Sequence, residues 1–98
     1  MMPGGLSEVK PATPEIQEMI NKVKSQIEEE TNEKFEEFEA EEYKTQVVAG
    51  INYFVKIKVG GSRYIHAKIF KGLPGQNEEL VLCGVQTNKA KDDELTGF

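Results

Sequence analysis

The spacing of apolar residues changes once along this chain, and that change restricts the fold more than any other feature. Up to about residue 32 the apolar residues recur at helical spacing. From Phe35 onward they alternate with polar residues, as in strands that bury one face. One helix followed by antiparallel strands predicts an α+β domain, with the helix lying across one face of a meandering sheet.

The predicted helix begins at Thr13. Threonine is a favourable N-cap, Pro14 suits the first helical position, and Glu15 stands near the positive end of the helix dipole. One apolar stripe is expected to face the core: Ile16, Met19, Ile20, Val23 and Ile27. The helix should end near Thr31-Asn32, although the acidic residues 28–30 oppose the dipole there and the sequence offers no explanation for them.

Four strands are predicted near residues 37–47, 51–59, 63–71 and 79–86, in a sheet of four to five antiparallel strands. In a meander, alternate turns lie at the same end of the sheet, so the first turn and the third turn (residues 73–77) should share one end. The helix spans about 27 Å at 1.5 Å per residue. It should therefore bring the lead-in, residues 1–12, to that same end; we expect this polar lead-in to be mobile.

The first predicted turn carries unusual residues. Turns are commonly built from Asn, Asp, Ser, Pro and Gly, yet here Val47, Val48 and Ala49 lie between two alternating segments, with Gly50 after them. Apolar side chains on a stiff loop make this turn a candidate contact surface. The simpler interpretation is that Val47 and Val48 only end a strand.

Composition limits the class of protein. The 98 residues suffice for a single domain (1–98), with 38% hydrophobic residues and 30% charged residues. No apolar run reaches membrane-spanning length, so no membrane partner is expected. A net charge of −5 argues against a nucleic-acid partner. One cysteine and no recognisable signal peptide favour the cytoplasm.

Little in the sequence suggests catalysis. His66 should lie roughly opposite Cys83 across the third hairpin, but a cysteine in mid-strand lacks a thiolate-favouring neighbour, so both are read as inert sheet residues. Two such residues cannot complete a zinc site either. Gly60-Gly61-Ser62 precedes a strand and not a helix, so it is read as a plain turn. We expect no enzyme activity, no metal and no cofactor.

Four elements in order resemble the stefins, the single-domain intracellular branch of the cystatins. They are Gly4 after a short N-terminal trunk, a Gln-x-Val-x-Gly signature at residues 46–50, a Leu-Pro-Gly hairpin at residues 73–75, and the acidic end of the chain at residues 92–98. The resemblance covers essentially the whole chain. Cys83 and the turn at residues 60–63 depart from the family pattern, but neither lies at the resembling elements.

The resemblance implies a cystatin-like fold and a reversible, tight-binding inhibitor of papain-like cysteine proteases, with papain and cathepsins L, S, H and B as partners. The implied protease-binding residues fall in three segments. They are Met2, Pro3 and Gly4 of the trunk; Gln46, Val47, Val48, Ala49 and Gly50 of the first hairpin; and Leu73, Pro74 and Gly75 of the third. Together they would form a wedge for the active-site cleft, carried by a monomer.

One alternative stays open on the sequence alone. An apolar first hairpin invites β pairing between copies, so the chain could be a structural or assembly protein that forms domain-swapped dimers or a crosslinked epithelial component. If Cys83 is exposed, it could also link two copies by oxidation.

Overall fold

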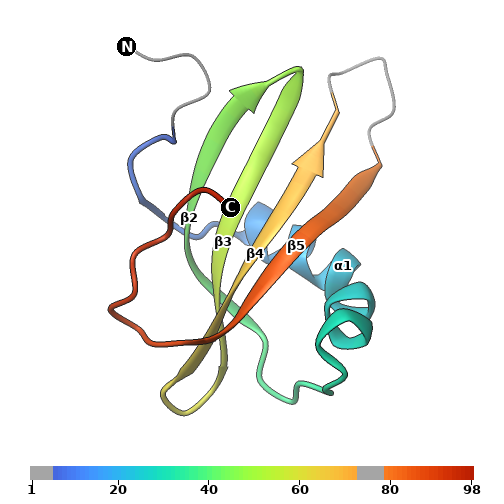
Figure 1. Ribbon diagram of the computed structural model, residues 1–98, viewed down its shortest axis with the longest axis vertical. Coiled ribbons are helices and arrows are strands. Elements are labelled where there is room, and N and C mark those ends of the chain that lie inside the picture. Colours follow the sequence, from blue (N-terminus) through green and yellow to red (C-terminus); the bar gives the residue numbers. More distant parts are fainter. Residues whose placement is uncertain (1–5, 73–78) are drawn as a thin grey trace.

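The computed structural model describes residues 6–72 and 79–98. A single helix packs on a five-stranded antiparallel sheet whose strand order follows the chain, β1-β2-β3-β4-β5 (Figure 1). The elements are β1 Lys10–Pro11, α1 Pro14–Thr31, β2 Glu39–Val48, β3 Gly50–Gly60, β4 Arg63–Lys71 and β5 Leu80–Lys89. The predicted α+β class and the helix-on-sheet arrangement are thus confirmed.

The helix begins where the sequence predicted. The Thr13 side chain accepts a hydrogen bond from the Ile16 backbone N–H, which satisfies one of the free donors of the first turn, and Pro14 occupies the first helical position. At the other end, Asn32 adopts the left-handed conformation with φ 58° and donates its backbone N–H to the Glu28 carbonyl oxygen.

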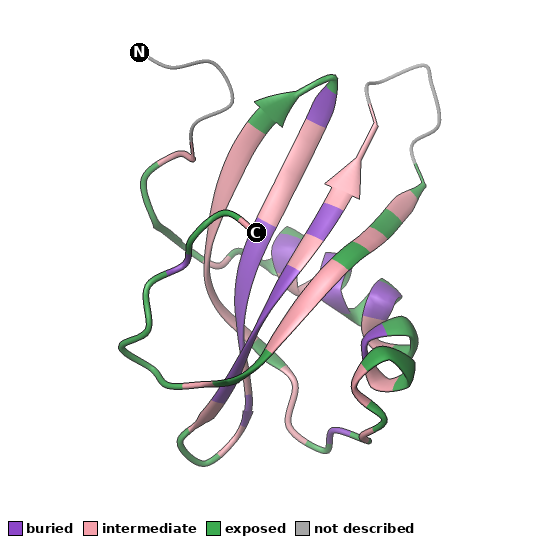
Figure 2. Cartoon of the chain, viewed as in Figure 1, coloured by how far each residue is buried: buried purple, intermediate pink, exposed green. Residues whose placement is uncertain are grey.

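The main core lies between α1 and the sheet. All five predicted stripe residues of α1 are buried against residues of β3 and β4, which alternate along each strand (Figure 2). The sheet residues of this core are Val55, Ile57, Val59, Ile65, Ala67 and Ile69. Because the period of a strand is two, the intervening residues of β3 and β4 point to the face opposite the helix.

The lead-in is wrongly predicted as mobile for residues 6–12, because they join the edge of the sheet. Lys10 and Pro11 form β1, which pairs with Tyr43 and Glu42 of β2. Pro11 is compatible with this place because an edge strand needs hydrogen bonds on one side only. No strand was predicted at these positions, because two residues are too few to show an alternating pattern.

A C-terminal strap, residues 90–98, crosses the face of the sheet opposite α1. In Figure 1 the helix passes behind β4 and β5, and the strap passes in front of β2 and β3. Three lysines on that face donate to main-chain oxygens of the strap. These bonds run from Lys44 Nζ to Leu95 (2.8 Å), from Lys56 Nζ to Lys91 (2.7 Å) and from Lys68 Nζ to Phe98 (2.8 Å).

Two apolar side chains also fix the strap. Leu95 is buried, and the Phe98 ring packs edge-on against Phe54 with centroids 5.7 Å apart. A side chain at Gly84 would meet the Phe98 ring at 3.2 Å, so the strap also fits closely over β5. Leu95 and Phe98 thus dock the end of the chain on the sheet.

Candidate functional site

The β2–β3 hairpin ends in the tip, residues 47–50, which presents apolar side chains to solvent. Val48 pairs with Gly50 and Val47 with Ile51, so the chain reverses at Ala49. Val47 is 70% exposed and Val48 is 42% exposed, and Ala49 is also exposed (Figure 2). These valines are among the few exposed large hydrophobic residues in the described part of the chain. The simpler interpretation, that Val47 and Val48 only end a strand, does not account for this exposure.

Gly50 allows the chain to turn at this point. Its φ of +128° lies in a region that side chains disfavour. A Cβ there would lie 2.6 Å from the Lys71 carbonyl oxygen and 2.7 Å from the Phe70 ring, which is closer than real contacts allow. The glycine of the predicted signature is thus required by the backbone of this hairpin.

Two other parts of the chain end beside the tip. Leu6 forms a bridge with Gln46, and the Ser7 backbone N–H donates to the Thr45 carbonyl at 2.8 Å. On the other side, Lys71 pairs with both Ile51 and Leu80, so β4 ends and β5 begins at the same end of the sheet as the tip. The other predicted site residues, Met2, Pro3, Gly4, Leu73, Pro74 and Gly75, lie outside the described residues.

The tip is uncharged in a chain rich in charge. No charged residue occurs between Lys44 and Lys56, although 30% of the whole sequence is charged. An exposed apolar surface without charges fits an apolar partner surface better than it fits a polar substrate.

A hollow that the sequence did not predict lies between the start of α1 and the sheet. It encloses about 550 Å³ and is lined by residues of both layers, among them Thr13, Glu15, Tyr53 and Leu80. Burial raises the pKa of Tyr53, with smaller contributions from the neighbouring Tyr43 and from Glu15. The Tyr53 phenol therefore stays neutral at pH 7.

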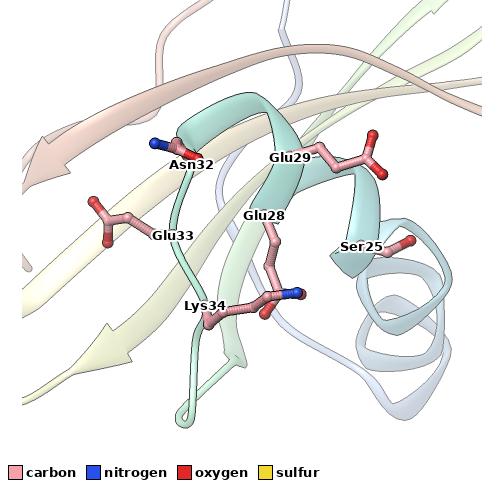
Figure 3. A pocket seen from close by; sticks show the side chains of 6 residues that line it. All are labelled: Ser25, Glu28, Glu29, Asn32, Glu33 and Lys34. Atoms are coloured by element: carbon pink, nitrogen blue, oxygen red, sulfur yellow. The ribbon is translucent and has the colours of Figure 1, made fainter.

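The opposite end of the helix carries a second hollow of about 330 Å³, lined mainly by acidic residues (Figure 3). Glu28 and Lys34 point toward each other with charged atoms 3.9 Å apart, and Glu28 also accepts the Phe35 backbone N–H at 3.0 Å. Glu28 thus stabilises the chain after α1, which accounts for one of the acidic residues at this helix end. Glu33 is paired with Arg63 at 2.6 Å, which lowers the Glu33 pKa.

The predicted pairing of His66 with Cys83 is wrong. His66 pairs with Gln86, and a bulge between the pairs Lys68–Gly84 and Ile69–Leu82 leaves Cys83 without a partner in the register. His66 is fully buried, whereas Cys83 is exposed. The two therefore make no dyad. Within residues 6–72 and 79–98, no group of three or more histidine, cysteine or acidic residues could hold a metal ion.

The fold and the tip together define a class of small α+β proteins with one helix on a meandering sheet and an apolar hairpin end. The cystatin domain family matches residues 4–92 of the chain. The chain is similar to cystatin-A from Homo sapiens (65% identical) and from Felis catus (67% identical), in each case over 100% of both chains. It is also 58% identical to leukocyte cysteine proteinase inhibitor 1 from Sus scrofa, over 100% of this chain and 95% of that relative.

The chain belongs to the cystatin family. This membership confirms the resemblance to the stefin branch and places the chain among protease inhibitors. Among the described residues, no helix is long and apolar enough to cross a membrane.

Proposed function

We propose that this protein is a reversible, tight-binding, competitive inhibitor of papain-like cysteine proteases, including papain and cathepsins L, S, H and B. The observation that carries the proposal is the exposed, uncharged tip, in which Val47 and Val48 project from a hairpin braced by its neighbours. The name of the porcine relative, a cysteine proteinase inhibitor, supports the same class of target.

The proposed wedge has three parts. The trunk, with Met2, Pro3 and Gly4, would lie along one side of the protease cleft. Residues 46–50 would enter the other side, and residues 73–75 would support them. The bridge between Leu6 and Gln46 supports this arrangement, because it brings the chain that follows the trunk beside the tip. The pairing of Lys71 with Ile51 supports it as well, because β4 ends there, shortly before residues 73–75.

The proposed inhibition works by occupation of the cleft and not by chemistry. The wedge would cover the catalytic cysteine without presenting a peptide bond in the geometry for attack. A hairpin paired on both sides loses little conformational entropy on docking. An interface of standard size, about 1,600 Å² in total, can then bind tightly.

Val48→Asp should weaken inhibition about 30-fold. A carboxylate at this position would have to lose its water inside an apolar cleft without a partner charge. Because Val48 is 42% exposed in the free protein, the melting temperature should change by less than about 2 °C. Val81→Asp, at a residue 46% exposed on the edge strand β5 and outside the three proposed segments, is the matched control. Equal inhibition constants for wild type and Val48→Asp would place the tip outside the interface.

Gly4→Arg should weaken inhibition about 100-fold and leave stability unchanged, because a side chain there would collide with the protease at the closest approach of the two chains. Deleting residues 1–4 should likewise speed dissociation without lowering the melting temperature. A drop in melting temperature would instead assign the trunk a structural role.

Titration of active papain and cathepsin L with the purified protein tests the function directly. We expect stoichiometric, reversible loss of activity that is competitive with a fluorogenic peptide. A folded monomer that inhibits neither enzyme would reject the proposal and favour the assembly alternative. Size-exclusion chromatography of the same sample would show domain-swapped dimers, if any form.

We further propose that residues 1–98 act as one inhibitory domain, and that the protein works in the cytoplasm.

A further inference from the structure

A row of paired residues crosses the sheet directly below the tip, on the face opposite α1. Gln46 of β2 pairs with Asn52 of β3, and Asn52 pairs with Phe70 of β4. Phe70 in turn pairs with Val81 of β5. None of these residues belongs to the helix-side core. These four side chains therefore contact their neighbours on the face of the sheet opposite the helix.

The Phe70 ring lies against Gly50. Its Cε1 and Cζ atoms are 2.7 Å from the point that a Cβ of Gly50 would occupy, so the ring fills the space left by the missing side chain. The ring thereby contacts the one residue of the tip whose backbone conformation is unusual, with φ +128°. Such packing restricts how far the end of the hairpin can swing relative to β4.

Asn52 acts on the other strand of the hairpin. Its Nδ2 atom donates to Gln46 Oε1 at 2.9 Å, a side-chain bond that joins β2 to β3 beyond the backbone ladder. The bond also orients the Gln46 amide, because the oxygen end faces Asn52. Two independent contacts, one to each end of the turn, therefore meet below the tip.

We propose that Phe70 and Asn52 are positioning residues that fix the direction of the tip, and that binding to cysteine proteases depends on this preorganisation. The inference rests on the proposed function. Neither residue needs to touch the protease, because each acts through Gly50 or Gln46. A tip without these contacts would still be formed but would have to be ordered on docking, and the ordering reduces affinity.

The test compares Phe70→Ala and Asn52→Ala with Val81→Ala, which alters the same row beyond Phe70. In the free protein, backbone ¹⁵N order parameters of residues 47–50 should fall from about 0.85 to below about 0.6 in both test variants and stay high in the control. Affinity for papain should fall about tenfold for Phe70→Ala and about fivefold for Asn52→Ala. Phe70→Tyr, which keeps the ring, should restore both quantities.

Each outcome decides the proposal. Unchanged order parameters would overturn it, and so would a mobile tip that binds papain with wild-type affinity. If Phe70→Ala fails to fold, Phe70→Leu removes the ring edge with less loss of volume and is measured in its place. If the wild type does not inhibit papain, the proposed function fails, and with it the dependence of binding on the tip; the order parameters alone then decide whether Phe70 and Asn52 fix the tip.

Discussion

Gly50→Val should abolish useful inhibition, with affinity for papain reduced more than 1,000-fold, and should also destabilise the fold. The φ of +128° is strained for any side chain and most for a β-branched one. The new Cβ would also meet the Lys71 carbonyl oxygen at 2.6 Å. Strain and overpacking together should cost about 4 kcal/mol, or roughly 15–30 °C in melting temperature for a domain of this size.

Thermal unfolding followed by circular dichroism, with papain titration of the folded fraction, measures both effects. A Gly50→Ala, Phe70→Ala double variant separates the two causes. It removes the ring but leaves the Lys71 oxygen in place, so inhibition should stay weaker than that of Phe70→Ala alone. A double variant that binds papain as well as Phe70→Ala does would show that the ring alone excludes a side chain. The control is Gly61→Ala in the distant turn, where φ is +50° and nothing lies within 4 Å, so this variant introduces backbone strain without a collision.

Acidification from pH 7 to pH 4.5 should reduce the free energy of unfolding by about 2 to 3 kcal/mol through His66 alone. The side chain is fully buried, and neither ring nitrogen has a hydrogen-bond partner. The pKa of His66 is lowered to about 4, chiefly by burial and also by the Lys56 and Lys89 ammonium groups, against an opposing effect of Asp93.

The sign follows from which state binds the proton. In the unfolded chain His66 titrates near pH 6.5, so between about pH 6.5 and pH 4 the unfolded state takes up a proton that the folded state does not. Stability is therefore complete above pH 6.5 and falls as the pH is lowered through this window. Glu33, whose pKa is lowered by its hydrogen bond to Arg63, affects stability only at the acid end of the range or below it.

His66 is the only histidine of the chain, so its Cε1–H resonance gives the folded-state pKa without assignment. Urea unfolding at pH 7 and pH 4.5 gives the stability loss. His66→Leu, which cannot take up a proton, should lose at most about 0.5 kcal/mol over the same interval. A titration midpoint near 6.5 in the folded protein, or equal losses in both proteins, would contradict the prediction.

Local patterns predicted most of this fold. The N-cap at Thr13 and the proline after it determine where α1 begins, and the stripe from Ile16 to Ile27 determines which side of α1 faces the sheet. The alternation of apolar residues predicted strands that bury one face, and the count of turns predicted that β4 and β5 meet at the tip end.

The features missed depend on contacts between distant residues. His66 lies opposite Gln86, three residues from Cys83. The bulge at Cys83 accounts for one residue of that difference, and the pairing of Lys71 with Leu80 across the third hairpin accounts for the rest. β1 forms because Lys10 and Pro11 find a free edge on β2, which a two-residue pattern cannot reveal. The β5 strand also extends to Lys89, beyond the predicted end near residue 86, because pairing with Tyr64 continues past the bulge.

For the candidate site, the sequence predicted the exposed tip but not its supports. The signature residues at 46–50 are contiguous and could be seen directly, whereas Phe70 and Asn52 reach the tip only through strand pairing. Which side chain fills the space beside a glycine depends on the register of neighbouring strands, and a single sequence does not state that register.

The lysines of the sheet bind the strap through its main-chain oxygens. Lys44, Lys56 and Lys68 each bind a main-chain oxygen, and a main-chain oxygen is present whatever residue carries it. Substitution of the exposed strap residues should therefore leave these contacts intact, so this end of the chain can diverge in composition at little cost. Inserting or deleting one residue between positions 91 and 98 is different, because it moves carbonyl groups out of reach of lysines whose spacing is set by the sheet. Length, beside the apolar side chains of Leu95 and Phe98, is thus the property that mutation can least change in this segment.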